Sequence, residues 1–254
     1  MSTFSSWRQP TEFARLARQL LTTRQESLTA HSSSSELHSA SSAALPSVAV
    51  LEARNLHLWR GDRHVLQGVS FRVAAGECLQ ITGSNGAGKT SLLRTLSGLM
   101  YPEEGQVLWN ARSIRDDLRE FHADLAYIGH EPPLKVDLTA KENLHYWIGT
   151  RWRLTSAEMK DALDRVGAGS WSDRPIRTLS AGQKRRVALA GLALMAVPVW
   201  LLDEPTTNLD REGQNLVGTL IEEHLERGGL AVAAVHHELS LRPSALRRLE
   251  LARG

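Results

Sequence analysis

The sequence predicts an α/β protein whose sheet is mainly parallel and is covered by helices on both faces. Three observations support this class. Short apolar runs alternate with helical patterns along residues 48–254. Several of these runs are apolar at consecutive positions, which is typical of strands buried on both faces. A glycine-rich loop also separates one such run from a helical pattern at residues 83–90.

The expected elements follow from these patterns. One strand is expected before a turn at Gly61-Asp62 and a second strand after it. Further strands are expected at residues 77–83, 105–110, 124–130, 199–205 and 230–237, the last of them as a final buried strand. Helices are expected at residues 89–99, 139–149, 155–167, 183–197 and 211–226. Thr139 and Thr155 stand where a side chain can cap the first turn of a helix.

Composition limits the kinds of partner. The chain has 254 residues, of which 42% are hydrophobic and 23% charged, and its net charge is +2. This balance does not indicate a nucleic-acid partner or an anionic membrane surface. A single cysteine, Cys78, excludes an internal disulfide, and we expect it in a buried strand. No run approaches the ~18 consecutive apolar residues that span a bilayer, so membrane contact is expected through a partner.

Residues 1–47 differ from the rest of the chain, and we expect the folded domain to cover residues 48–254. Apolar residues within 1–30 have helical spacing, but charged residues interrupt them and exclude a signal peptide. The following segment HSSSSELHSASSAA is rich in serine and cannot form a core. Three interpretations remain open: a disordered extension, a start codon placed too early, and a docking helix on a flexible linker.

The segment GSNGAGKT, Gly83 to Thr90, matches the pattern G-x-x-x-x-G-K-[ST] directly between an expected strand and helix. In P-loop nucleotide-binding proteins the backbone N–H groups of this loop surround phosphate oxygens, and the helix N-terminus favours the anion. Lys89 would reach the β- and γ-phosphates, and the Thr90 hydroxyl would ligate Mg²⁺. The expected ATP-binding residues here are Gly83, Ser84, Asn85, Gly86, Ala87, Gly88, Lys89, Thr90 and Ser91.

An apolar run at residues 199–202 leads into two adjacent carboxylates, Asp203 and Glu204. Burying a charged group is costly unless it is paired or binds a metal ion, so two carboxylates at the end of a buried strand need an explanation. Asp203 would hold Mg²⁺ beside a triphosphate, and Glu204, pointing the other way, would orient and polarise the attacking water. The alternative is a strand end with two solvated acids, which the nearby phosphate loop disfavours.

Three further segments resemble the ATP-binding subunits of ABC transporters. LSAGQKRR begins at Leu179 and resembles their signature, TNLD ending at Asp210 resembles the D-loop, and VHHEL resembles the switch-histidine loop. The resemblance implies a parallel core sheet, an antiparallel β subdomain and a helical signature subdomain. It also implies that two subunits meet head to tail and trap ATP, with Ser180, Gly182, Gln183 and Asp210 acting at the interface.

The same resemblance leaves two assignments open and reveals one departure. His237 matches the switch histidine best, because Glu238 and Leu239 follow it, and His236 is the alternative. For the adenine-stacking position, Trp59 is favoured by chemistry and Arg60 by register. The family's glutamine that touches Mg²⁺ is replaced by Glu131, which can ligate the ion but adds negative charge. The implied catalytic set is Lys89, Glu204 and His237, and the implied Mg²⁺ ligands are Thr90, Asp203 and Glu131.

The segment GHEPPLKVDLTAKENL, residues 129–144, is similar to a stretch of the cytochrome c biogenesis ATP-binding export proteins, the CcmA family. This resemblance covers residues 48–254. It implies a peripheral subunit on the cytoplasmic side of a bacterial inner membrane, with a multi-pass CcmB-like partner and a CcmC-like partner. ATP hydrolysis would then drive haem export or release of a haem-loaded CcmE-like chaperone.

Three other functions compete with this one. The chain could serve another ABC importer or exporter, and the co-purifying membrane subunit would distinguish the two. Soluble ABC proteins that act on ribosomes or DNA usually carry two cassettes or a coiled-coil insertion, which this sequence lacks. A nucleotide-gated module without hydrolysis is disfavoured by the presence of Lys89, Asp203 and Glu204, whereas Glu131 leaves this alternative open.

Overall fold

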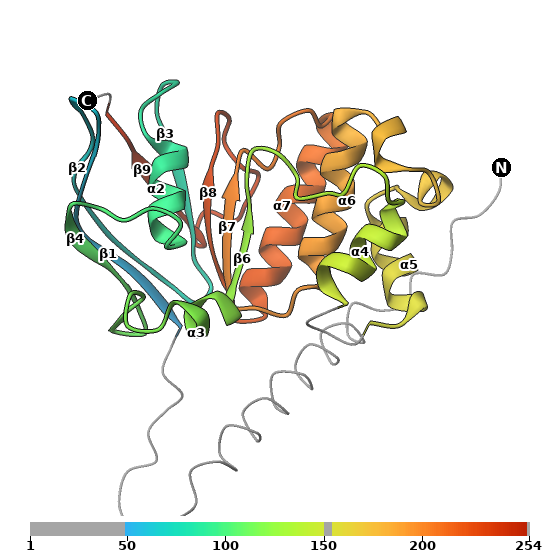
Figure 1. Ribbon diagram of the computed structural model, residues 1–254, viewed down its shortest axis with the longest axis horizontal. Helices are drawn as coiled ribbons and strands as arrows, with labels where there is room; N and C mark the ends of the chain where they lie inside the picture. Colours follow the sequence, from blue (N-terminus) through green and yellow to red (C-terminus); the bar gives the residue numbers. More distant parts are fainter. Residues whose placement is uncertain (1–48, 150–153, 253–254) are drawn as a thin grey trace, which may run out of the picture. The chain divides into compact units, whose positions relative to one another are not determined.

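The computed structural model describes residues 49–149 and 154–252 (Figure 1). The expectations for residues 1–47 therefore lie outside the described residues. The described chain forms an α/β fold with two sheets and a group of helices, in agreement with the predicted class. No helix of this part of the chain has the length and apolar content needed to cross a bilayer.

The first sheet is antiparallel and has the strand order β2-β1-β4-β5. Its strands are β1 (Val50–Arg60), β2 (Arg63–Ala74), β4 (Glu104–Trp109) and β5 (Arg112–Ser113). The hairpin predicted around Gly61 and Asp62 is confirmed, because β1 and β2 pair antiparallel up to Arg60 and Arg63. The two-residue strand β5 was not predicted, since so short a segment carries no detectable alternation.

The second sheet is parallel throughout and has the order β6-β7-β8-β3-β9. Its strands are β3 (Cys78–Thr82), β6 (Leu125–Ile128), β7 (Val199–Asp203), β8 (Leu230–Ala234) and β9 (Leu246–Glu250). Strand β8 is buried along its whole length, as predicted, but the strand that follows it was not predicted. The edge strand β9 follows it, and its half-exposed, charged sequence LRRLE lacks the apolar run by which the inner strands were recognised.

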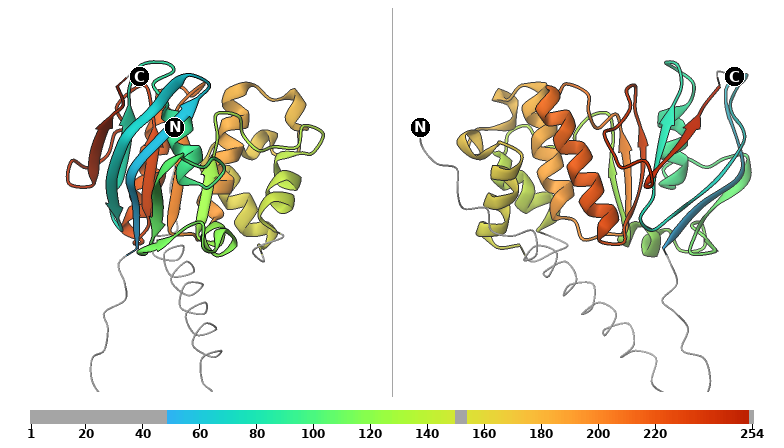
Figure 2. Two further views of the ribbon diagram at one scale, coloured as in Figure 1. Left: turned by 60° about the vertical axis from the view of Figure 1, so that its left-hand side comes forward. Right: turned by 180° about the vertical axis from the view of Figure 1, so that it is seen from behind.

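The helices α4, α5 and α6 pack on one another at the end of the fold opposite the antiparallel sheet (Figures 1 and 2). The α-helices are α2 (Lys89–Leu96), α3 (Leu118–Ala123), α4 (Ala140–Ile148), α5 (Ser156–Arg165), α6 (Ala181–Leu194) and α7 (Arg211–Glu226). Thr139 and Thr155 cap α4 and α5 in capping boxes, as predicted. Helix α3 was not predicted.

One apolar core joins the two sheets to α2. Buried residues of β1, β3, α2, β7 and β8 meet in it, including Leu51, Leu79, Leu92, Leu201 and Val232. Burying a side chain of this size stabilises the fold by about 1.5–3 kcal/mol. The core holds the carboxyl ends of the parallel strands in a fixed arrangement, and the candidate site lies at those ends.

The lone cysteine occupies the expected place in a strand. Cys78 begins β3 and is fully buried, and its backbone N–H donates a hydrogen bond to the carbonyl of Ala245. Burial raises the pKa of the Cys78 thiol to about 12, so the residue is an inert packing group.

Candidate active site

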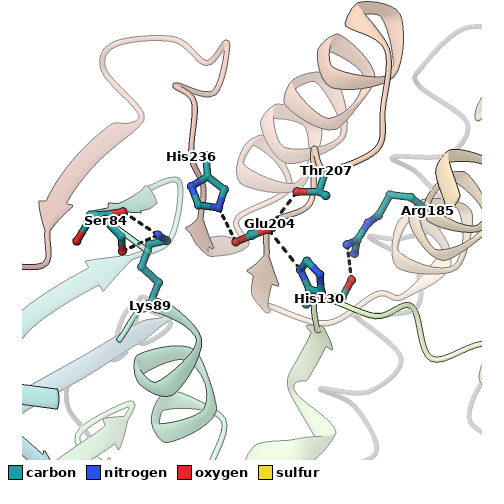
Figure 3. A network of polar contacts seen from close by, with 8 residues as sticks. Ser84, Lys89, His130, Arg185, Glu204, Thr207 and His236 are labelled. Carbon is teal, nitrogen blue, oxygen red and sulfur yellow. Dashed lines mark hydrogen bonds and ion pairs between the residues drawn. The ribbon is translucent and has the colours of Figure 1, made fainter. Parts of the chain in front are cut away.

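The candidate site is built from the loops that follow four parallel strands. Strand β3 leads into the phosphate loop, β8 into the two histidines, and β6 into residues 129–131. Strand β7 ends at Asp203 and is followed by Glu204. Because the strands are parallel, these loops emerge at the same edge of the sheet, where open α/β sheets bind ligands. Figure 3 shows side chains from all four loops facing one another.

The phosphate loop needs glycine at its last position. Gly88 has φ +101°, a conformation that other residues rarely adopt, and it immediately precedes α2. A Cβ atom at Gly88 would stand 2.7 Å from Cγ1 of Val65 in the neighbouring hairpin. The loop therefore packs closely against β2, and it leaves the N-terminus of α2 directed at the loop's concave side.

Lys89 is folded over this loop. Its side chain is nearly buried, and Nζ donates hydrogen bonds to the carbonyl oxygens of Gly83 at 2.7 Å and Ser84 at 3.4 Å. From the other side, Nη2 of Arg63 donates to the Gly86 carbonyl at 2.6 Å. The lysine ammonium is thus held inside the loop, where an anion would meet it together with the backbone N–H groups.

The other residues expected to bind ATP differ in their burial and contacts. Ala87 is buried, and its N–H donates a hydrogen bond to the Ser84 carbonyl across a turn at 3.0 Å. Asn85 is exposed, and Ser91 lies half-buried in α2.

Asp203 ends β7 with only 1% of its surface exposed. Burial raises the pKa of its carboxyl group, and a hydrogen bond from Thr90 opposes that rise. Its Oδ2 atom is buried and has no hydrogen-bond partner among the residues that the structure describes. A buried carboxylate oxygen without a partner, beside a hydroxyl at the mouth of a phosphate loop, fits a hard divalent cation such as Mg²⁺.

Glu204 has a strained backbone. Its φ of +51° lies in the left-handed region, which costs a non-glycine residue about 1–3 kcal/mol. Its carboxylate accepts hydrogen bonds from Nε2 of His236 at 2.7 Å and from the Thr207 hydroxyl at 3.2 Å. Nδ1 of His130 lies 3.3 Å from Oε2 (Figure 3). Burial raises the pKa of Glu204, but the hydrogen bond from His236 and these other contacts outweigh it and leave the pKa lowered.

The two adjacent histidines after β8 differ in what they contact. His236, the alternative switch histidine of the sequence analysis, contacts Glu204. His237, the favoured assignment, is exposed, and within the described residues its side chain makes no polar contact. The buried side chain of Gln80 in β3 accepts a hydrogen bond from the Leu239 N–H at 3.1 Å and so anchors the loop that carries both histidines.

Ser180 caps α6, as the sequence suggested. Its Oγ accepts a hydrogen bond from the N–H of Gln183 at 3.2 Å, and the Gln183 side chain accepts one from the Ser180 N–H at 2.9 Å. Gly182 packs against the D-loop, because a Cβ atom there would stand 2.5 Å from the carbonyl oxygen of Asn208. The signature and the D-loop of one chain are therefore in contact.

Asp210 caps α7 and joins that helix to α6. Its Oδ1 accepts hydrogen bonds from the N–H of Gly213 and from Nη2 of Arg186, both at 2.9 Å. The hydrogen bond from Gly213 is the largest cause of the lowered pKa of Asp210, and Arg186 adds to it. In this structure Asp210 is engaged within its own chain.

The structure also shows contacts of residues that the sequence did not single out. Arg185, in the first turns of α6, is 2% exposed and donates hydrogen bonds to the carbonyl oxygens of Gly129 at 3.0 Å and His130 at 2.6 Å. These bonds fix the loop after β6. Glu131 in the same loop is exposed, and its carboxylate makes no polar contact within the described residues.

The two candidates for the adenine contact lie on different faces of β1. The Trp59 ring stacks on His64, with ring centroids 3.8 Å apart and planes 6° from parallel. Neighbouring residues of a strand point to opposite faces, so Arg60 lies on the other face. There it pairs across the hairpin with Arg63, the residue that contacts the phosphate loop. The structure thus brings Arg60, and not Trp59, to the phosphate-loop side of the sheet.

Together these groups can bind a polyphosphate and activate a water. The phosphate loop supplies N–H groups and an ammonium, Asp203 and Thr90 supply oxygen ligands for a cation, and Glu204 supplies an oriented base. His130, Arg185 and Gln80 were missed from the sequence. The only local signal was the position of His130 at the end of an expected strand, which is also where many packing residues stand.

Comparison with known proteins agrees with this geometry. The family model described as "ABC transporter" matches residues 66–207. The cytochrome c biogenesis ATP-binding export protein CcmA of Yersinia pestis bv. Antiqua (strain Nepal516) is 44% identical over 203 residues, which are 80% of this chain and 93% of that protein. CcmA of Escherichia coli (strain K12) is 43% identical over 202 residues, 80% of this chain and 96% of that protein.

Solved structures share the fold. A putative ABC transporter ATP-binding protein from Pyrococcus furiosus superposes with a TM-score of 0.69 at 25% identity, covering 79% of this chain and 97% of that one. The cbiO1 protein from Clostridium perfringens, part of the ABC transporter complex cbiONQ, has a TM-score of 0.61 at 28% identity, with coverages of 74% and 78%.

Proposed function

This chain belongs to the ABC transporter family as an ATP-binding subunit, and from that membership we propose that it hydrolyses ATP in a complex for c-type cytochrome maturation. The observation that carries the hydrolytic part is the Glu204 carboxylate, which stands beside the phosphate loop and is oriented by His236 at 2.7 Å. The observation that supports the pathway is the 43–44% identity to CcmA proteins over nearly their whole length.

ATP is the substrate, and its phosphates fit the loop Gly83 to Thr90. Lys89, now bonded to the Gly83 and Ser84 carbonyls, would turn its ammonium to the β- and γ-phosphates. Asp203 and Thr90 would hold Mg²⁺, which when bound neutralises phosphate charge. The unpartnered Oδ2 of Asp203 supports this assignment. Glu131 stays a third candidate ligand, which would have to turn inward from its exposed position.

Glu204 would accept the proton of the attacking water. Its lowered pKa keeps the carboxylate ionised, as a proton acceptor must be. We assign the switch-histidine role to His236, because this residue contacts Glu204 and His237 does not. On the phosphate-loop side of the antiparallel sheet, Arg60 would contact the adenine, since a guanidinium can stack on an aromatic ring.

A second copy of the chain completes the site. Ser180 is exposed at the N-terminus of α6, and Figure 1 shows α6 and α2 on opposite sides of β7 and β8. The signature of one subunit would therefore meet the phosphate loop of the other, with the α6 N-terminus and the Gly182 N–H groups directed at the γ-phosphate. ATP bridges the two halves and ADP does not, so nucleotide state would control closure.

The membrane partners would be a CcmB-like multi-pass subunit and a CcmC-like protein, at the cytoplasmic face of a bacterial inner membrane. Closure of the dimer would drive haem export or release of a haem-loaded CcmE-like chaperone. A pull-down of the full chain from detergent-solubilised native membranes tests this pathway. Recovery of CcmB-like and CcmC-like proteins supports it, and recovery of a different permease would reassign the chain to another ABC importer or exporter.

Hydrolysis is tested by comparing the parent with Glu204→Gln and His236→Ala. Loss of a general base lowers turnover by about 10²–10⁴-fold, while Glu204→Gln should still bind ATP and favour the closed dimer. ATPase rate and ATP-dependent dimerisation are the measurements. Parental turnover in Glu204→Gln would show that the base has been misassigned.

A further inference from the structure

The Glu204 carboxylate is held on both of its oxygens. His236 donates to Oε1 at 2.7 Å, and Oε2 lies 3.3 Å from Nδ1 of His130 and 3.2 Å from the Thr207 hydroxyl. The terminal torsion of a glutamate side chain is broad, so one hydrogen bond leaves the carboxylate plane free to turn. Contacts on both oxygens are needed to fix the plane in which a water would be held.

His130 and Thr207 act on Oε2 from different elements. Thr207 is only three residues beyond Glu204, so it belongs to the same turn and moves with the carboxylate. His130 follows β6, a strand that pairs with β7. Only His130 therefore places Oε2 relative to another part of the sheet (Figure 3).

The position of His130 depends on the signature helix. Arg185 of α6 donates to the carbonyls of Gly129 and His130, and those two bonds orient the backbone from which the imidazole extends. The guanidinium is 2% exposed, so neither bond competes with bulk water. A chain of direct contacts thus runs from α6 through residues 129–130 to the catalytic carboxylate.

We propose that His130 is a positioning residue for ATP hydrolysis, because its imidazole fixes Oε2 of Glu204, and that Arg185 links the position of His130 to the signature helix α6. The inference rests on the proposed hydrolytic role of Glu204. A displacement of α6 relative to the sheet would move the Gly129 and His130 carbonyls with Arg185, and would thereby change the contact between the imidazole and the carboxylate.

The test compares His130→Leu, which removes the polar contact to Glu204, with His130→Gln, which keeps a polar N–H group at this position. The imidazole is 62% exposed, so neither change removes much packing. His145→Leu is the matched control, because His145 is an exposed histidine on α4 away from these contacts. Each full-length variant is assayed for kcat, KM for ATP, binding of a fluorescent ATP analogue and thermal midpoint, beside the parent and Glu204→Gln.

We expect His130→Leu to lower kcat by up to about fivefold, as loss of a largely exposed contact between an imidazole and a carboxylate should. KM, analogue binding and thermal midpoint should stay at parental values, and His130→Gln should recover most of the rate. Parental kcat in His130→Leu, with Glu204→Gln inactive, overturns the role of His130 and leaves the proposed function intact. Equal rates in the parent and Glu204→Gln overturn the proposed function and the inference with it.

The coupling to α6 is tested by a double-mutant cycle with Arg185→Lys. A lysine cannot span both carbonyls as the planar guanidinium does. If Arg185 acts through His130, His130→Leu lowers kcat much less in the Arg185→Lys background than in the parent. Additive losses in a folded double variant would refute the coupling.

Discussion

His224 makes the stability of this fold sensitive to acid. The imidazole lies in α7, is 4% exposed and stacks on Trp200 with ring centroids 3.9 Å apart. Its Nε2 donates a hydrogen bond to the Leu230 carbonyl at 3.1 Å. Burial lowers the pKa of His224 from 6.5 to about 3, since the charged form would lose its hydration.

The size of the effect follows from that pKa. Between pH 6.5 and pH 3 the unfolded chain binds one proton that the folded chain does not. The contribution is therefore fully present above pH 6.5 and falls by about 1.4 kcal/mol for each unit below it. From about pH 7.5 to about pH 5 the free energy of unfolding should drop by about 2 kcal/mol through this residue alone.

The variant His224→Phe removes the titratable group and keeps a ring against Trp200. It loses the hydrogen bond to the Leu230 carbonyl, which should lower the free energy of unfolding by about 1–3 kcal/mol at neutral pH. The proteins are therefore compared by how steeply the free energy of unfolding changes with pH. Urea unfolding of the parent, His224→Phe and the exposed control His145→Phe would be followed at constant ionic strength. The parent and control should lose about 2 kcal/mol more than His224→Phe over this range. Parallel curves for all three proteins would refute the account.

Two further predictions concern the active site. Gly182→Ala should abolish ATP turnover and lower the thermal midpoint, because the new Cβ would stand 2.5 Å from the Asn208 carbonyl oxygen and push the signature away from the D-loop. Circular dichroism melting and an ATPase assay measure these effects, and a melting curve like that of the parent would contradict the prediction. Arg60→Ala should raise KM for ATP more than Trp59→Ala does, because Arg60 pairs across the hairpin with Arg63, which contacts the phosphate loop. A larger increase of KM in Trp59→Ala would return the adenine contact to Trp59.

Much of the fold and the phosphate loop could be predicted because the signals are local. The glycines of residues 83–90, the apolar run before Asp203 and the capping residues Thr139 and Ser180 each act within a few positions of chain. The preferences behind them, glycine for unusual φ values and hydroxyls for the first turn of a helix, belong to the residue types themselves.

Local signals could not decide which of two adjacent histidines occupies the switch position. His236 and His237 have the same chemistry, and either suits a switch position. The turn after β8, anchored by Gln80 159 residues earlier in the chain, directs His236 at Glu204. Likewise, the pairing register of the hairpin places Arg60 opposite Arg63 and leaves Trp59 on the other face.

Residue order alone thus establishes an α/β ATP-binding chain with its phosphate loop and paired carboxylates, since those motifs depend on short-range backbone geometry. Tertiary structure decides which side chains surround Glu204. His130 and Arg185 lie 55 positions apart and carry no motif that links them. They meet because parallel pairing brings the end of β6 beside that of β7 and packing places α6 against the loop after β6.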